Sequence, residues 1–155
     1  RGESVRFLEE VDQINLRRRQ RVVDLVEEEA GRLDGVRVAV LGLAFKPHSD
    51  DIRDSPALDI ALRLAENGAI VTATDPEAIP NARQHAPQLT YIDTPADAVA
   101  GADIVVLITE WPEFTGLDPH KVGELVSRRT IIDGRNALDA DAWKAAGWRF
   151  RGIGR

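Results

Sequence analysis

Residues 36–59 read VRVAVLGLAFKPHSDDIRDSPALD, and this stretch determines the fold that we predict for the chain. It opens with an apolar, β-branched run over residues 36–41, which is typical of a buried parallel strand. A polar loop follows from 45 to 54. Ser55-Pro56 then indicates a helix start, because the serine hydroxyl caps free N–H groups and proline suits the first helical position. Together these features predict the first unit of a doubly wound parallel sheet, in which ligands bind at the carboxyl ends of the strands.

The loop after this strand does not carry a dinucleotide-binding fingerprint. A G-x-G-x-x-G pattern beginning at Gly42 would need glycine at positions 44 and 47, where the chain has Ala44 and Pro47. We therefore do not expect a pyrophosphate on a glycine-rich turn, and Lys46 and Arg53 are the better candidates for binding an anion. The alternative is a decorated loop that binds no ligand of its own.

Composition limits the classes of function. The chain has 155 residues, 43% hydrophobic and 30% charged, which is ordinary for one soluble globular domain. No apolar run approaches the ~20 residues of a membrane span. No signal-peptide pattern is present and cysteine is absent, so we expect a cytoplasmic protein without disulfides. The net charge of −6 argues against a broad nucleic-acid surface, and three scattered histidines give no metal site.

The first 33 residues differ from the rest of the chain. Apolar residues recur at helical spacing from Val5 to Leu33, which predicts one long helix with a cationic middle over residues 17–21. At 1.5 Å per residue it would run roughly 43 Å, longer than a compact domain of this size requires. Two interpretations remain open, a surface helix that kinks onto its own domain and a connector whose front half packs elsewhere. We favour the connector, with Leu8, Val11 and Ile14 buried by another copy of the chain or frayed.

The remaining residues predict alternating strands and helices. We expect strands at 70–74, 91–92, 104–108, 130–133 and 148–153, and helices from 56 to 67, from 94 to 101, from 118 and from 139 to 147. The run at 104–108 is the most apolar and should be central. Residues 77–89 show no clear periodicity. The fold class predicted is α/β, a Rossmann-like parallel sheet flanked by helices and preceded by a long N-terminal connector helix.

Two features near strand ends have alternative interpretations. Asp75, at the end of the second strand, can bind a ribose hydroxyl as in Rossmann folds, or it can cap a turn. We favour the turn cap. Trp111 and Phe114 can stack on a base or sugar, but aromatic residues beside a proline are more often part of the packing.

Three cations fall just beyond predicted strand ends. Lys46, Arg53 and Arg135 would lie along one rim of a parallel sheet, with Gly134 allowing the sharp bend that precedes Arg135. Arginine offers bidentate geometry and lysine a point charge, so this rim is a plausible phosphate site on an acidic protein. The alternative is that each cation is a solvated charge or a partner of the loop's own aspartates.

Several separate motifs resemble one known family, in the family's order. They are LGLAFKPHSDDIRDSPALDIALRL at 41–64, Asp75-Pro76, TEWPEF at 109–114, DGRN at 133–136 and GIG at 152–154, together with Ile14-Asn15 in the first helix. These motifs resemble the C-terminal, UDP-binding domain of the UDP-glucose/GDP-mannose dehydrogenase family. Nearly the whole chain is covered by the resemblance.

The resemblance implies roles for particular residues. The family residues that match Phe45, Lys46 and Arg135 contact the UDP-sugar, and the one that matches Arg53 reaches the NAD bound on another domain. The resemblance also implies that residues 1–34 are part of a central connector and dimerisation helix. Residues 35–155 would be the UDP-sugar-binding domain, and the protein a homodimer.

The family reaction oxidises the sugar C6 alcohol twice, with two NAD as acceptors, through a thiohemiacetal on a cysteine. This chain contains no cysteine and no NAD fingerprint, so we expect no catalytic residues in it and no activity from it alone. The TEWPEF run resembles the members of the family that act on UDP-glucose more than their relatives, and this resemblance implies an NAD-dependent UDP-glucose 6-dehydrogenase that makes UDP-glucuronate. The alternatives are a homologous GDP-mannose or UDP-N-acetylhexosamine dehydrogenase domain, or a stand-alone nucleotide-binding module without chemistry.

Overall fold

Six parallel strands form one sheet at the centre of the protein. A computed structural model describes the backbone of residues 2–153, and the side chains of Gln13 and residues 15–153. The strands are β1 Arg37–Leu41, β2 Ile70–Thr74, β3 Thr90–Tyr91, β4 Ile104–Leu107, β5 Thr130–Asp133 and β6 Arg149–Gly152. Their order in the sheet is β3-β2-β1-β4-β5-β6, with each neighbouring pair parallel. This is the predicted Rossmann-like, doubly wound arrangement, in which successive strands are added in one direction from β1 to β3 and in the other direction from β4 to β6.

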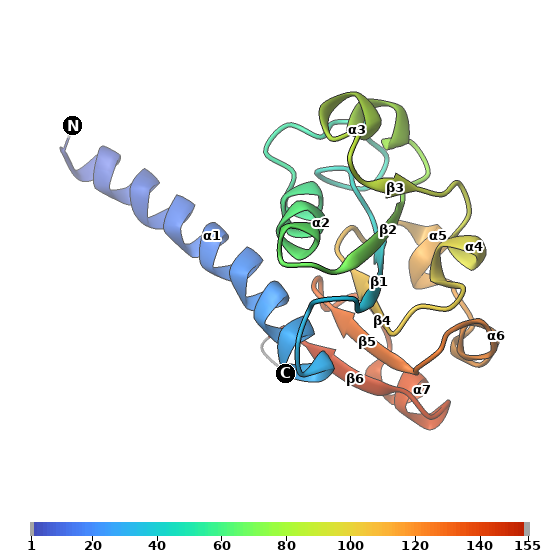
Figure 1. Ribbon diagram of the computed structural model, residues 1–155. Coiled ribbons are helices and arrows are strands. Elements are labelled where there is room, and N and C mark those ends of the chain that lie inside the picture. The colour runs from blue at the N-terminus through green and yellow to red at the C-terminus, as the bar shows by residue number, and fades with distance from the viewer. Residues whose placement is uncertain (1, 154–155) are drawn as a thin grey trace.

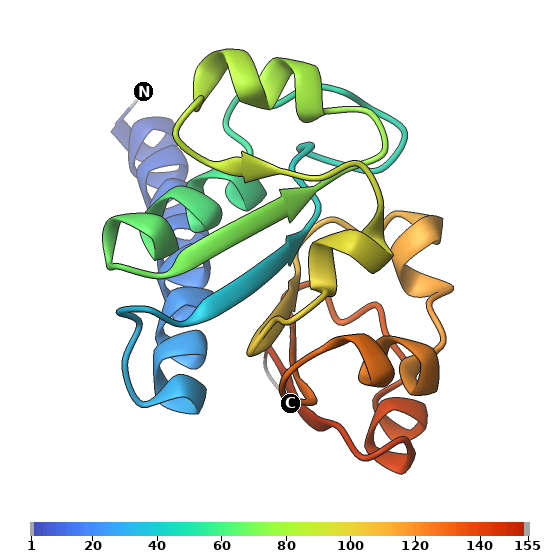
Figure 2. The same ribbon diagram turned by 45° about the vertical axis from the view of Figure 1, so that its right-hand side comes forward.

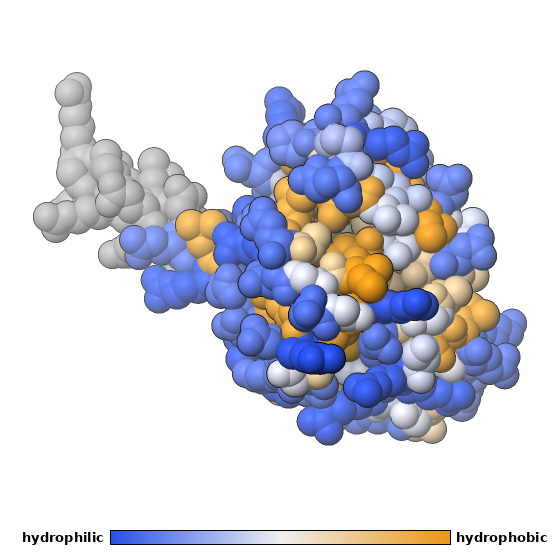
Figure 3. All heavy atoms as spheres, in the orientation of Figure 1, coloured by the Kyte–Doolittle hydropathy of each residue, from blue (hydrophilic) through white to orange (hydrophobic). Residues whose placement is uncertain are grey.

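Helices cover both faces of this sheet (Figures 1 and 2). They are α1 Gly2–Ala30, α2 Pro56–Glu66, α3 Ile79–His85, α4 Pro95–Val99, α5 Pro112–Thr115, α6 Pro119–Leu125 and α7 Ala140–Ala145. The helices α1 and α2 pack together on one face, while α4 to α7 lie on the other. Hydrophilic side chains cover most of the outer surface in Figure 3, with hydrophobic ones gathered near the middle of the domain. No helix among the described residues is long and apolar enough to cross a membrane. The cytoplasmic location stays a prediction.

The predicted strands and helix starts are confirmed with small shifts at their ends. The strand at 104–107 is buried along its whole length between β1 and β5, as its composition indicates. Four helices begin with a side-chain cap at the predicted residue, namely Ser55, Thr94, Asp118 and Asp139. Each of these side chains accepts a hydrogen bond from a backbone N–H of the first turn, and so supplies the acceptor that the helix itself lacks.

Two short helices were not predicted. The helix α3 has seven residues, begins without a side-chain cap and buries only Ile79 and Ala82. Two buried residues in two turns give no recognisable period, so the sequence pattern at 77–89 does not indicate a helix. The helix α5 is a single turn that follows Trp111.

The long first helix is confirmed as one continuous element of 29 residues. Its C-terminal half packs on the sheet through Val22, Val23, Leu25 and Val26, which are buried. Its N-terminal half leads away from the sheet (Figure 1), so the helix does not fold back onto its own domain. The side chains of Leu8, Val11 and Ile14 lie outside the described residues, so their burial stays a prediction.

An ion-pair cluster joins the last turn of α1 to the outermost strand, β6. The Glu29 side chain is 4% exposed and accepts hydrogen bonds from Arg149 and, at 2.6 Å, from Arg151 Nη1. Burial alone raises the pKa of Glu29, but the hydrogen bonds and charges of the two arginines together lower it below the usual value. The carboxylate is therefore ionised at neutral pH, and the cluster connects the end of α1 to β6.

Candidate functional site at the carboxyl edge of the sheet

The loops that follow β1 and β4 pass in direct contact at the carboxyl edge. Gly42, the first residue after β1, has φ 113°, a conformation that side chains disfavour. A Cβ atom on Gly42 would lie 2.5 Å from the backbone nitrogen and side chain of Thr109, which follows β4. Glycine is therefore required at position 42 for both conformation and space, independently of any bound nucleotide.

Asp75 is the buried centre of this edge. Its Oδ2 accepts hydrogen bonds from the Leu43 and Ala44 amides at 2.8 and 2.9 Å and from Trp111 Nε1 at 3.1 Å. Its Oδ1 accepts from two amides of its own turn, those of Glu77 and Ala78. The favoured interpretation of Asp75 as a turn cap is confirmed, because both of its oxygens are engaged by the protein and it is only 3% exposed.

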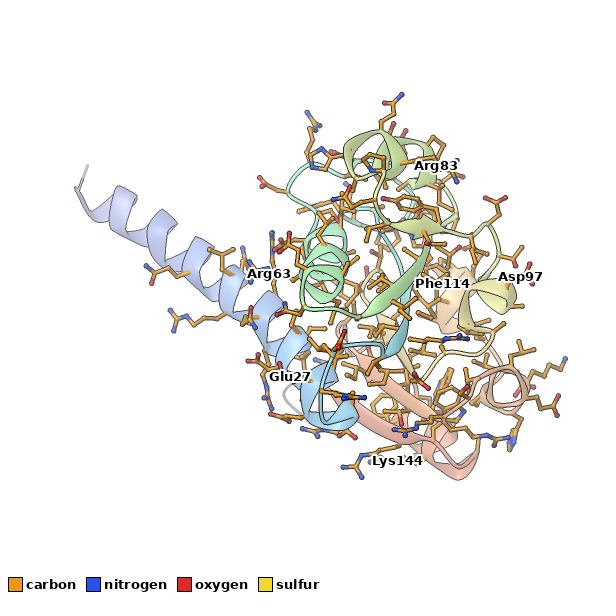
Figure 4. All side chains as sticks on the ribbon, in the orientation of Figure 1. Glu27, Arg63, Arg83, Asp97, Phe114 and Lys144 are labelled. Carbon is orange, nitrogen blue, oxygen red and sulfur yellow. The ribbon has the colours of Figure 1, made fainter. Side chains whose placement is uncertain are left out.

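The two aromatic residues after β4 belong to the core. Trp111 is 3% exposed and Phe114 is 1% exposed. Figure 4 shows Phe114 pointing from α5 toward the sheet. The His48 and Trp111 rings pack in an edge-to-face arrangement with their centroids 5.4 Å apart. The packing interpretation is confirmed for both residues.

Phe45 and Lys46 are the first solvent-exposed residues of the loop after β1. Both are exposed, and Phe45 is one of the few large apolar residues of the described chain with half its surface in solvent, at 51%. The Phe45 amide donates to the carbonyl of Asp51 at 2.7 Å, which closes the loop into a compact turn. An exposed aromatic ring beside an ammonium group suits contact with a ligand or another domain.

Arg53 is paired within its own loop. Its Nε and Nη2 each lie 3.0 Å from an oxygen of Asp51, a bidentate pair, although the Arg53 side chain is 89% exposed. The Arg53 side-chain hydrogen bonds, the Arg53 backbone amide and the nearby Lys46 charge lower the pKa of Asp51 from 3.8 to about 2. The alternative in which a rim cation pairs with a loop aspartate is thus confirmed for Arg53.

Arg135 lies on a different part of the edge. Its Nε is 2.7 Å from Glu110 Oε2, and its side chain is 41% exposed. It lines a cavity of about 530 Å³ together with Arg18 and Arg19 of α1. The predicted gathering of three rim cations is therefore only partly correct. Arg53 binds the Asp51 carboxylate and Lys46 lies near enough to lower its pKa, whereas Arg135 pairs with Glu110 and lines a cavity with the α1 arginines.

The reason for Gly134 also differs from the prediction. Its backbone is not left-handed, and a Cβ atom there would lie 2.9 Å from the Leu107 carbonyl of the adjacent strand. The sharp turn falls instead on Asn136, with φ 54°. Close approach to β4, rather than a bend, requires glycine at position 134.

Arg19 was not singled out from the sequence. Its Nη1 lies 3.3 Å from Asp59 Oδ2, its Nη2 donates to the Asp54 carbonyl at 3.1 Å, and its buried Nε has no partner among the described residues. Arg63 of α2 joins the same contact between α1 and α2 (Figure 4). The signal was available, because Arg19 precedes the buried Val22 and Val26 by three and seven positions and so shares their helix face.

Backbone strain concentrates in the same loops. His48, Asp54 and Asn136 are the non-glycine residues with positive φ in the described chain, at 62°, 51° and 54°. Such conformations persist only where the surroundings enforce them, and they cluster at functional sites. Among the side chains that the structure describes, no group of three histidine or acidic residues converges on a possible metal.

Known proteins with similar sequences belong to one family of enzymes. The model of the UDP-glucose/GDP-mannose dehydrogenase family, UDP binding domain, matches residues 39–140. UDP-glucose 6-dehydrogenase TuaD of Bacillus subtilis is 37% identical over 155 residues, which are 99% of this chain and 34% of the relative. UDP-glucose 6-dehydrogenase of Rhizobium meliloti is 40% identical over 131 residues, 84% of this chain and 30% of the relative.

Solved structures with a similar fold include nucleotide-sugar dehydrogenases. A UDP-glucose dehydrogenase from Pyrobaculum islandicum superposes with a TM-score of 0.79 at 34% identity, over 92% of this chain and 31% of the other. A UDP-D-ManNAc dehydrogenase from Pyrococcus horikoshii gives a TM-score of 0.69 at 30% identity, over 88% and 30%. The chain thus spans about a third of the length of the relatives it matches. From the family match and the shared fold, we conclude that the chain belongs to the UDP-glucose/GDP-mannose dehydrogenase family and corresponds to its UDP-binding domain.

Proposed function

We propose that this chain is the UDP-sugar-binding domain of an NAD-dependent UDP-glucose 6-dehydrogenase. The observation that carries the proposal is the exposed Phe45-Lys46 pair at the carboxyl edge, which directly follows the buried and hydrogen-bonded residues 43 and 44. Arg135 stands at the end of a nearby strand, and the family match spans all three residues. Ligands of doubly wound sheets bind at this edge.

The three residues offer complementary chemistry to a nucleoside diphosphate. The Lys46 ammonium supplies a mobile point charge, and the Arg135 guanidinium supplies a fork that matches two phosphate oxygens. Glu110 accepts from Arg135 Nε in the free chain, so a phosphate group would replace one charged partner of Arg135 with another. The Phe45 ring adds apolar surface beside the ammonium, where it contacts the sugar or base.

Arg53 serves a different ligand in this proposal. It lies at the far end of the loop, largely exposed and held by Asp51, so that it reaches toward a neighbouring domain. NAD supplies the hydride acceptor in the whole enzyme and is bound mainly outside this chain, which has Ala44 and Pro47 where a glycine fingerprint would stand. Only a peripheral contact from Arg53 is proposed here, and the chain alone is predicted to form no NADH from UDP-glucose.

Residues 1–34 form the connector and dimerisation helix in this proposal, and 35–155 the UDP-sugar domain. Support comes from α1, whose N-terminal half leads away from the sheet while its C-terminal end is bound to β6 through Glu29. The missing partners are an NAD-binding domain and a second copy of the chain. The catalytic cysteine would also lie outside these 155 residues.

UDP-glucose is preferred over other nucleotide sugars for a specific reason. The Pyrobaculum UDP-glucose dehydrogenase is closer in both TM-score and identity than the Pyrococcus UDP-D-ManNAc dehydrogenase. A more distant ternary complex of a GDP-mannose dehydrogenase, from a Pseudomonas species, superposes at 22% identity and supports the fold alone. The N-acetylhexosamine substrate remains the second candidate.

The test uses the full-length enzyme with three single substitutions. Losing a charged hydrogen bond costs about ten- to a hundred-fold in affinity. Lys46→Ala and Arg135→Ala should weaken UDP-glucose by that amount and NAD far less, and Arg53→Ala should do the reverse. Apparent affinity is measured for each ligand with the other saturating. Lys121→Ala, on the exposed side of α6, is the control and should change neither affinity. The separate roles are wrong if Arg53→Ala and Arg135→Ala shift both ligands by equal factors.

A further inference from the structure

Leu43 and Ala44, the two residues just before Phe45, are held entirely by side chains. Both residues are buried, at 0% and 1% exposed. Asp75 Oδ2 accepts from both of their amides, Ser55 Oγ donates to the Leu43 carbonyl at 2.6 Å, and Thr109 Oγ1 donates to the Ala44 carbonyl at 2.8 Å. All four backbone polar groups of the pair therefore have a side-chain partner.

These side chains supply the backbone hydrogen bonds that a neighbouring strand supplies within the sheet. The ladder of β1 runs to Leu41, and Gly42 still donates to the Thr74 carbonyl of β2. Beyond that point no strand pairs with the chain, yet buried backbone groups must find partners. Asp75 follows β2 directly and Thr109 follows β4 closely. Their side chains therefore form hydrogen bonds to residues 43 and 44, as the backbones of β2 and β4 do to β1 within the sheet.

The path of the chain into Phe45 and Lys46 is thereby fixed from both sides. The segment cannot shift without leaving buried donors or acceptors unpaired, which costs far more than the small net gain of forming each bond. Trp111 Nε1 also donates to Asp75, so the loop after β4 supports the same carboxylate. The Asp54-Ser55 turn closes the other end of the loop, with Ser55 serving both Leu43 and the α2 cap.

We propose that Asp75, Thr109 and Ser55 are positioning residues for nucleotide binding, which touch no ligand and set where Phe45 and Lys46 are presented. This assignment depends on the proposed function, since Lys46 is taken to bind the diphosphate. The buried hydroxyl of Thr109 is the sharpest point to test. It holds a single backbone carbonyl, and valine keeps its shape without the donor.

If these residues only stabilised the fold, losing a similar hydrogen bond elsewhere in the sheet would weaken UDP binding equally. Trp148 lies at the opposite, amino edge of the sheet, just before β6, and its Nε1 donates to the Pro119 carbonyl at 2.8 Å. Trp148→Phe and Trp111→Phe each remove one indole donor and keep an aromatic ring. The two substitutions are therefore matched in chemistry but lie at opposite edges.

The experiment measures UDP affinity by calorimetry and unfolding by urea on the 155-residue chain. Losing one hydrogen bond that positions Lys46 corresponds to about a three- to tenfold loss of affinity. We expect that loss in Thr109→Val and Trp111→Phe, recovery in Thr109→Ser, and no more than about twofold change in Trp148→Phe at similar loss of stability. The proposal is overturned if Thr109→Val binds UDP like the wild type, or if Trp148→Phe weakens UDP equally.

A second readout separates this proposal from the proposed function. If the wild-type chain binds no UDP, the proposed function fails, and hydrogen exchange at the Leu43, Ala44 and Phe45 amides still tests the positioning. Thr109→Val should speed exchange at these amides by about three- to tenfold, whereas Trp148→Phe should not. Equal exchange in both variants would show that Thr109 does not hold this segment.

Discussion

Two consecutive parts of one loop are built in opposite ways. Residues 42–44 are buried, and the backbone polar groups of Leu43 and Ala44 are bound by side chains from other parts of the sheet edge. Residues 45–54 are exposed or only partly buried, and the Arg53 side chain binds the carboxylate of Asp51 within the same stretch. The groups that hold the backbone are therefore separate from the groups that we propose to contact a ligand.

The energies of the two parts should differ in the same way. An orphaned buried donor or acceptor costs about 1–3 kcal/mol, whereas an exposed ion pair contributes about 0–1 kcal/mol. Substitutions in 42–44 and its partners should therefore reduce the free energy of unfolding. Substitutions among the exposed cations should change affinity and leave stability nearly unchanged.

The largest effect is expected for Asp75→Ala. The change leaves five donors without their acceptor in a buried site, so the free energy of unfolding should fall by about 3–5 kcal/mol. Urea unfolding followed by circular dichroism measures it. A loss under about 1 kcal/mol would mean that water replaces the carboxylate and that the contrast between the two parts is wrong.

Gly42→Ala should have the next largest effect. It adds strain at φ 113° to a contact of 2.5 Å with Thr109, for a loss of about 2–4 kcal/mol. Gly31→Ala is the matched control, because Gly31 has φ 80° and nothing within 4 Å of an added Cβ. The control should lose only the conformational part, about 1 kcal/mol. Equal losses in the two variants would refute the role of the Thr109 contact.

The exposed part of the loop should respond differently. Lys46→Ala and Arg53→Ala should each change the free energy of unfolding by less than about 0.5 kcal/mol, because both side chains are exposed. The same urea experiment measures these variants beside Asp75→Ala. Destabilisation of Lys46→Ala by more than about 1 kcal/mol would show that the cations also support the fold.

The smallest predicted effect is on the titration of Asp51. Its pKa in the folded chain, about 2, lies below the ordinary 3.8, so the pair with Arg53 contributes above pH 3.8 and is lost as the pH falls through about 2. Carboxyl NMR from pH 7 to 3 should find Asp51 ionised throughout in the wild type. In Arg53→Gln its midpoint should rise toward 3.8. A wild-type midpoint near 3.8 would show that the pair does not form in solution.

The sequence alone predicted the elements whose signals are local. Strand β4 is continuously apolar, and Ser55-Pro56 combines a capping hydroxyl with a helix-compatible proline, so both were found. The helix α3 was missed because only two of its residues reach the core. The turn-capping role of Asp75 was predicted, but its bonds to Leu43 and Trp111 join residues distant in sequence and needed the tertiary structure.

The candidate site was predicted in part for the same reason. Strand-end positions for Lys46 and Arg135 followed from the pattern, since parallel strands end at one edge. Which carboxylate each arginine pairs with depends on side-chain direction, and the pairing of Arg135 with Glu110 separates it from Arg53. Arg19 was overlooked within a cationic run whose members differ only in the helix face they occupy.

The most direct test of the account is UDP titrated into the isolated 155-residue chain, followed by amide NMR. We expect saturable shifts that are largest at Phe45, Lys46 and Arg135, with smaller shifts at Arg53. Little change is expected at Trp148, on the opposite edge of the sheet. No shifts up to millimolar UDP, or the largest shifts outside the carboxyl edge, would contradict the proposal that this edge binds the nucleotide.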